Sequence, residues 1–166
     1  MMTDRQANDD VYKATVSMDE LGNLVDHLNE DLAGELQSII MYVEYTALLR
    51  GLHRGELAEI LKKDIPDLQR HAKVLADQIS ALGGTPTTMP RPVPRAVGAR
   101  QILRNIHERA TRAVDDYTDR IAEAALKRDS GLKAELERLA ADATRHRNEV
   151  AEILAGWTES WSESSK

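Results

Sequence analysis

The chain carries an internal repeat, and this repeat constrains its fold more than any other feature. The pattern Asp-x-x-Arg-His occurs at 67–71 and again 75 residues later at 142–146. The same offset, without a gap, aligns Tyr42 with Tyr117. Because one offset relates positions spread along the chain, we infer that it has two similar halves. Such halves pack around a pseudo-two-fold axis, so the two histidines of the repeat are predicted to face each other.

Each half is predicted to form two amphipathic helices. Apolar residues recur every three or four positions, as they do on the buried side of a helix. Aromatic residues make up 4% of the chain and Phe is absent, which suits close packing of helices. Ser17 and Glu20 form a capping-box pattern at the start of the first helix. The predicted helices span about 18–49, 56–82 and 99–128, and the last runs from the turn at 129–131 to about Trp157.

The connection between the second and third helices predicts the topology. Residues 84–98 contain four of the five prolines and are too long for a tight helix hairpin. A connection of this length can run along a bundle and place the third helix parallel to the second. We therefore predict an all-α fold, an antiparallel four-helix bundle with one long crossover. The predicted bundle spans 18–157, between a disordered N-terminal tail at 1–17 and a polar C-terminal tail at 158–166.

Composition excludes several classes of function. The formal net charge is -6, whereas general nucleic-acid binding requires a basic face. The absence of Cys excludes disulfides, thiolate metal sites and a Cys nucleophile. No apolar run approaches the roughly 20 residues of a membrane span, and the N-terminus does not resemble a signal peptide. We expect a soluble, cytoplasmic protein that binds neither nucleic acid nor membrane.

Three polar residues interrupt the predicted core stripes. Glu35 lies between apolar residues on the first helix, and His71 and His146 do so on the second and fourth. A buried carboxylate is costly unless it is paired or bound to a metal. The three side chains could satisfy one another or reach solvent at the edge of a stripe. They could also hold a metal, because they are expected at equivalent heights on different helices.

Longer segments resemble a known family. The segments LNEDLAGELQSIIMYVEY, IPDLQRHAKVLADQISALGGTP and DATRHRNEVAEIL are similar to the bacterioferritin-related branch of the ferritin-like proteins. The resemblance covers about residues 20–157 and implies the ferritin-like topology. It also implies a di-iron centre, held by a Glu from each of two helices and a Glu-x-x-His from each of the other two.

Carried over position by position, the resemblance predicts a degenerate metal site. The retained ligand positions are Glu35, His71 and His146. Three glutamate positions have lost their carboxylate and hold Leu68, Ala110 and Ala143. One carboxylate and two histidines cannot hold two bridged irons, so the resemblance implies iron at low occupancy or none. Two histidines and one carboxylate are, however, a known arrangement for a single Fe(II).

Asp67 and Asp142 have two possible roles. Each lies four residues before its histidine and could turn toward the metal position as a second-rank ligand. Each could instead pair with Arg70 or Arg145, or fix the tautomer of a histidine. The sequence leaves both roles open.

These observations leave three functional hypotheses. The first is a non-ferroxidase binding or structural protein, with a small apolar ligand in the former metal pocket. The second is an iron-dependent oxidoreductase that uses Glu35, His71 and His146. The third is metal-free acid–base catalysis by the two histidines. Whether the chain is an enzyme is therefore open. The short polar C-terminus leaves no room for a fifth helix, so we expect a homodimer rather than a large cage.

Overall fold

Four α-helices make up the structure, a computed structural model that describes residues 4–51 and 53–157, with side chains from Asn23 onward. None of the described residues forms a strand. This confirms the all-α prediction. The helices are α1 (Asp4–Leu48), α2 (Arg54–Ala81), α3 (Gly98–Leu126) and α4 (Ser130–Ala155).

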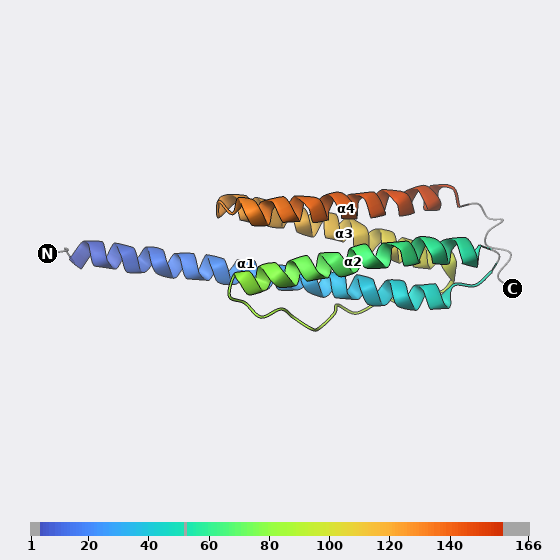
Figure 1. Ribbon diagram of the computed structural model, residues 1–166, viewed down its shortest axis with the longest axis horizontal. Coiled ribbons are helices and arrows are strands. Elements are labelled where there is room, and N and C mark those ends of the chain that lie inside the picture. Colours follow the sequence, from blue (N-terminus) through green and yellow to red (C-terminus); the bar gives the residue numbers. More distant parts are fainter. Residues whose placement is uncertain (1–3, 52, 158–166) are drawn as a thin grey trace.

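The helices form two antiparallel hairpins, α1–α2 and α3–α4, packed side by side (Figure 1). Short turns close both hairpins. The second turn is fixed by Asp129, whose side chain accepts a hydrogen bond from the backbone N–H of Leu132 at 2.9 Å. This is an N-cap contact that satisfies a free donor in the first turn of α4. Gly83, with φ of +82°, ends α2 in a conformation that other residues avoid.

The connection between α2 and α3 runs along the outside of α1, as Figure 1 shows. The backbone N–H of Arg91 donates to the carbonyl of Ala33 at 3.0 Å. The hydroxyl of Tyr45 donates to the carbonyl of Pro94 and accepts a hydrogen bond from Asn105 on α3 at 2.8 Å. These contacts hold in place an extended, proline-rich segment that is not part of a helix or a sheet. The predicted crossover and the parallel course of α2 and α3 are confirmed.

The first helix begins earlier than the sequence predicted. α1 extends back to Asp4, so residues 4–17, predicted as a disordered tail, continue the helix. No Gly or Pro stands between Asp4 and Leu21 to stop it, and the capping-box pattern at Ser17 does not mark a helix start. The other predicted helix ends agree to within two residues. Residues 1–3 and the predicted tail at 158–166 lie outside the described residues.

A layer of polar residues divides the core into two apolar clusters. One cluster contains Leu28, Leu75, Tyr117 and Leu139 among its buried residues. The other contains Met41, Leu61, Ile106 and Val150. On each helix, a buried charged or polar side chain falls between residues of the two clusters: Glu35, His71, Arg109 and His146.

No described helix is both long enough and apolar enough to span a membrane.

Candidate functional site

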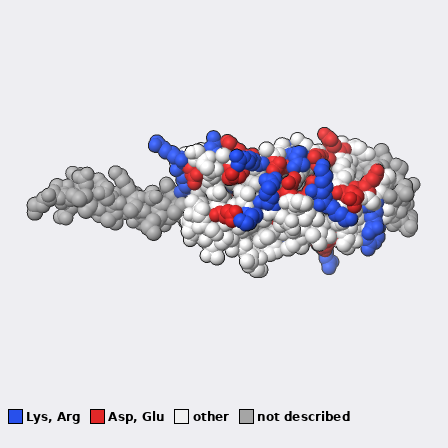
Figure 2. All heavy atoms as spheres, in the orientation of Figure 1, with Lys and Arg blue, Asp and Glu red and all other residues white. Residues whose placement is uncertain are grey.

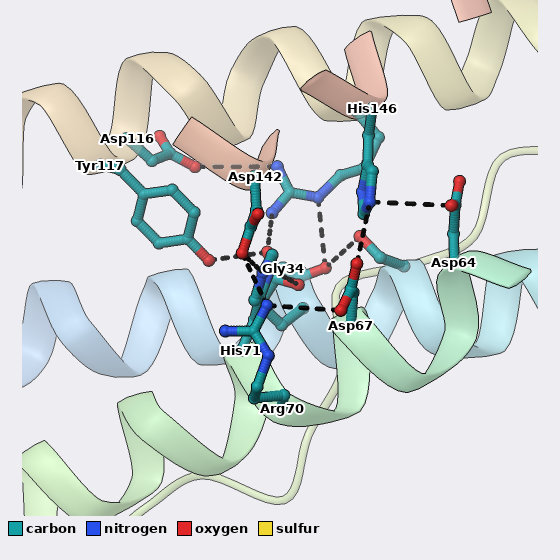
Figure 3. A network of polar contacts seen from close by, with 12 residues as sticks. Gly34, Asp64, Asp67, Arg70, His71, Asp116, Tyr117, Asp142 and His146 are labelled. Atoms are coloured by element: carbon teal, nitrogen blue, oxygen red, sulfur yellow. Dashed lines mark hydrogen bonds and ion pairs between the residues drawn. The ribbon is translucent and has the colours of Figure 1, made fainter. Parts of the chain in front are cut away.

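His71 and His146 face each other at the centre of the bundle, as the repeat predicted (Figure 3). Their ring centroids are 6.3 Å apart and the ring planes make an angle of 22°. Their exposed fractions are 1% and 2%. One histidine comes from α2 and the other from α4, so the pair joins the two halves of the repeat.

The Asp and Arg residues of the repeat form ion pairs that cross between the halves. Arg70 donates to Asp142 at 2.6 Å, and Arg145 donates to Asp67 at 2.9 Å. The pairs within one helix are longer, at 3.4 Å for Arg70 with Asp67 and 3.5 Å for Arg145 with Asp142. This crossed pattern is what a pseudo-two-fold axis between the two halves would produce. In it, each aspartate pairs with the arginine of the other half.

These contacts keep both aspartates ionised. Burial alone would raise the pKa of Asp67, but hydrogen bonds from Arg145 and Arg70 outweigh it and lower that pKa. The pKa of Asp142 is likewise lowered, because hydrogen bonds from Arg70 and His71 outweigh the effect of burial.

His71 contacts one carboxylate near the surface and another in the interior. Its Nε2 atom lies 3.4 Å from the carboxylate of Asp142, and its Nδ1 atom lies 3.6 Å from the carboxylate of Glu35. Burial disfavours an imidazolium here, but the carboxylates of Glu35 and Asp142 outweigh burial and raise the pKa of His71. The two carboxylates, one partly exposed and one buried, therefore favour the protonated form of the ring.

Glu35 is a buried carboxylate with cationic and hydroxyl partners on three sides. The hydroxyl of Tyr117 donates to its Oε1 atom at 2.8 Å, and Arg109 Nη2 lies 3.7 Å from the same oxygen. Burial would raise the pKa of Glu35, yet the contacts with His71, Arg109 and Tyr117 outweigh it and lower that pKa. Glu35 is thus kept ionised by protein groups.

Arg109 is one of two site residues that the sequence interpretation missed. Its guanidinium is buried, and its Nε atom donates to the carbonyl of Gly34 at 3.2 Å. A Cβ atom at position 34 would lie 2.3 Å from Arg109 Nη2, so the glycine makes room for the side chain. The 75-residue offset pairs Gly34 with Arg109, and Glu35 with Ala110. The 75-residue offset could therefore have pointed to Arg109, because it pairs this arginine with the glycine that precedes Glu35.

Asp64 was also missed. It is buried, and its carboxylate lies 3.7 Å from His146 Nε2, which is also 3.5 Å from Asp67. Burial raises the pKa of Asp64, although the nearby His146 opposes the shift. Asp64 lies three residues after Leu61 and four before Leu68, so the stripe argument used for Glu35 could have found it.

The centre of the site holds one small cavity, with a volume of about 20 Å³. This is room for about one water molecule. The cavity is too small for the apolar ligand that the sequence predicted, and charged side chains border it together with apolar ones. Among its lining residues are the three retained ligand positions, Arg109, and the three positions without carboxylates: Glu35, His71, His146, Arg109, Leu68, Ala110 and Ala143.

The residues of this cavity do not fit a di-iron centre. Two irons bridged in a four-helix bundle need four carboxylates and two histidines, whereas the cavity contains one carboxylate, Glu35. The guanidinium of Arg109 already brings a positive charge to that carboxylate. His146 Nε2 is close to Asp64 and Asp67. Among the described residues, no group of three or more His, Asp or Glu is arranged to hold a metal ion.

Comparison with known families gives a match over most of the chain. A family model described as a ferritin-like domain matches residues 25–159. The chain belongs to the ferritin-like family. This confirms the resemblance inferred from its sequence and agrees with the bundle topology described above.

Three relatives illustrate the relationship. A structure described as ferritin-like, diiron-carboxylate proteins from Bacillus anthracis str. Ames is 37% identical, covers 81% of this chain and 97% of that chain, and has a TM-score of 0.80. A bacterioferritin from Desulfovibrio desulfuricans is 37% identical over 70 residues, or 42% of this chain and 39% of that protein. The chain thus matches about two fifths of the length of this bacterioferritin.

A third relative shares the fold at lower identity. The bacterioferritin-related protein from Bacteroides fragilis, described as a dodecameric thioferritin, is 18% identical. The match covers 88% of this chain and 92% of that chain, with a TM-score of 0.76. At this level of identity the likeness shows the fold alone.

Proposed function

We propose that the chain is a non-ferroxidase member of the ferritin-like family, a binding or structural protein in which ion pairs replace the di-iron centre. The observation that carries the proposal is the position of Arg109. Its guanidinium lies 3.7 Å from Glu35, the one carboxylate that lines the central cavity. A fixed cation thus stands beside the carboxylate that a metal would need.

Charge balance supports this reading. In a di-iron site, four carboxylates offset the charge of two Fe(II) ions. Here Glu35 is already matched by Arg109 and His71, and the crossed Arg–Asp pairs satisfy Asp67 and Asp142. Bringing in a divalent cation would break contacts on which buried charges depend, and a buried charge left without its partner is strongly destabilising.

Iron binding and oxidation test the proposal directly. The purified chain would be loaded with Fe(II) under anaerobic conditions, desalted and assayed for iron, and then exposed to oxygen while Fe(III) formation is followed by absorbance. The proposal expects no retained iron above that of the His71→Ala variant, and no faster oxidation than in protein-free buffer. Two irons retained per chain with rapid oxidation would overturn it.

A second candidate is an iron-dependent oxidoreductase with one metal at Glu35, His71 and His146. It is favoured by the fact that all three side chains line one cavity and that Glu35 and His71 are 3.6 Å apart. The same loading experiment separates the two. About one iron per chain, lost in His71→Ala, would support the oxidoreductase and overturn the metal-free protein.

As part of the proposal, the protein acts in the cytoplasm as a homodimer that pairs through the outer face of α1. Ile40 and Val43 on this face are 45% and 56% exposed. The 75-residue offset places Asp115 and Thr118, both exposed, at the equivalent positions of α3. The equivalent positions of the other half are thus polar, so the fold itself does not require apolar residues at positions 40 and 43. Figure 2 shows few charged side chains over α1 and the crossover, in contrast to α2 and α4.

A further inference from the structure

Three buried polar atoms of the site lack hydrogen-bond partners. They are Oε2 of Glu35, Nε2 of His146 and Nη1 of Arg109, and none has a hydrogen-bond partner within the described part of the chain. The nearest charged groups make only longer ion-pair contacts, at 3.6 Å from Glu35 Oε2 to His71 and 3.5 Å from His146 Nε2 to Asp67. An unsatisfied buried polar group is costly. Three in one place indicate a partner from outside the chain.

The space beside these atoms matches a water molecule. Glu35 and His146 both line the central cavity of about 20 Å³. A buried water needs at least about 10–15 Å³ and two to four polar partners. Ser38 and Tyr42 also line the cavity.

We propose that this cavity is a binding site for one ordered water molecule, which donates a hydrogen bond to Glu35 and bonds His146 Nε2. Other occupants fit less well. The volume excludes larger molecules, and a small apolar molecule would leave the buried atoms of Glu35 and His146 without hydrogen-bond partners. Glu35 disfavours an anion, while Arg109 and His71 disfavour a cation. The inference rests on the proposed function, since a metal in the cavity would displace the water.

Oxygen-17 magnetic relaxation dispersion tests the site, because it counts water molecules with long residence times inside a protein. The measurement compares the metal-free protein with Ala143→Val, which fills the cavity, and Ala141→Val, an exposed position on the same helix. We expect Ala143→Val to lose about one long-lived water and Ala141→Val to lose none. The comparison is needed because Asp31 and Arg120 also carry buried atoms without hydrogen-bond partners among the described residues.

A second pair of variants covers a failure of Ala143→Val to fold. Ala110→Val fills the same cavity from α3, and exposed Ala125→Val is its control. Equal water counts in the filled and control variants, or no long-lived water in the parent protein, would overturn the inference. Iron is assayed on the same samples. Bound iron would overturn both the proposed function and the water site, whereas a metal-free sample without the water would overturn the water site alone.

Discussion

The guanidinium of Arg109 on α3 lies directly against the backbone of Gly34 on α1, with Nε 3.2 Å from the glycine carbonyl. The pair occupies equivalent positions in the two halves of the repeat, 75 residues apart. Position 34 has no side chain, and the long side chain at position 109 fills the space beside it. The Asp, Arg and His residues of the repeat are therefore the same in both halves, whereas positions 34 and 109 differ and pack against each other. This packing places a cation beside Glu35.

Replacing Gly34 with Ala is expected to destabilise the fold by about 1–3 kcal/mol, the cost of disturbing a buried hydrogen-bonded charge. The new Cβ would lie 2.3 Å from Arg109 Nη2, so the guanidinium must move away from Glu35. Urea unfolding measures the change. Gly55→Ala is the control, because a Cβ there meets nothing within 4 Å and Ala favours the helix. Equal stability changes in the two variants would show that Arg109 adapts freely.

The Arg109–Glu35 pair should show strong coupling in a double-mutant cycle. Arg109→Met leaves Glu35 with His71 and Tyr117 as its partners, and we expect a loss of about 3–5 kcal/mol, as for other broken buried pairs. Glu35→Gln in the same chain should recover part of that loss, because the uncompensated carboxylate is gone. Unfolding free energies of the four proteins give the coupling energy. A value near zero would mean that the two residues act independently.

The sequence predicted much of the fold because the repeat and the apolar stripes carry it. The offset that aligns Asp67 with Asp142 also predicted that His71 and His146 face each other, and their rings are stacked. The proline-rich crossover at 84–98 predicted the topology. The start of α1 differs from the prediction, because the capping-box pattern at Ser17 indicates a helix start but lies in a segment that has no helix breaker.

The site was less predictable, because a spacing argument does not show how far a long side chain reaches. Asp67 and Asp142 pair across helices, since Arg70 and Arg145 extend to the opposite half. The burial of Arg109 is hard to predict from the sequence, because arginine is seldom buried without a partner. Its partner is a backbone carbonyl exposed by Gly34 together with Glu35, a relationship that depends on helix packing.

Asp31 should make the stability of the protein depend on pH. Burial raises its pKa to about 7, against the opposing effect of Arg120. Between about pH 4 and pH 7 the unfolded chain releases this proton while the folded chain keeps it, so stability falls as pH rises through that range. At roughly 1.4 kcal/mol per pKa unit, the loss reaches up to about 4 kcal/mol.

The variant Asp31→Asn tests this effect, because it cannot titrate. We expect its stability relative to the parent protein to increase between pH 4 and pH 7 and to stay constant above that range. Thermal and urea unfolding across the range give the difference. Asp77→Asn, an exposed position paired with Lys73, should leave the pH profile of the parent protein unchanged. A parallel pH profile for Asp31→Asn and the parent would show that Asp31 ionises normally.

The proposed dimer makes a prediction about single charges on α1. Ile40→Glu places a carboxylate at the centre of the face, where in a self-paired dimer it meets its own copy. Like charges that are desolvated together are strongly unfavourable, so the variant should be a monomer while its helix content is retained. Light scattering coupled to size-exclusion chromatography gives the mass. Thr118→Glu, on the outer face of α3, is the matched control and should remain a dimer. A parent protein that is monomeric at high concentration, or a dimer that survives Ile40→Glu, would rule out this interface.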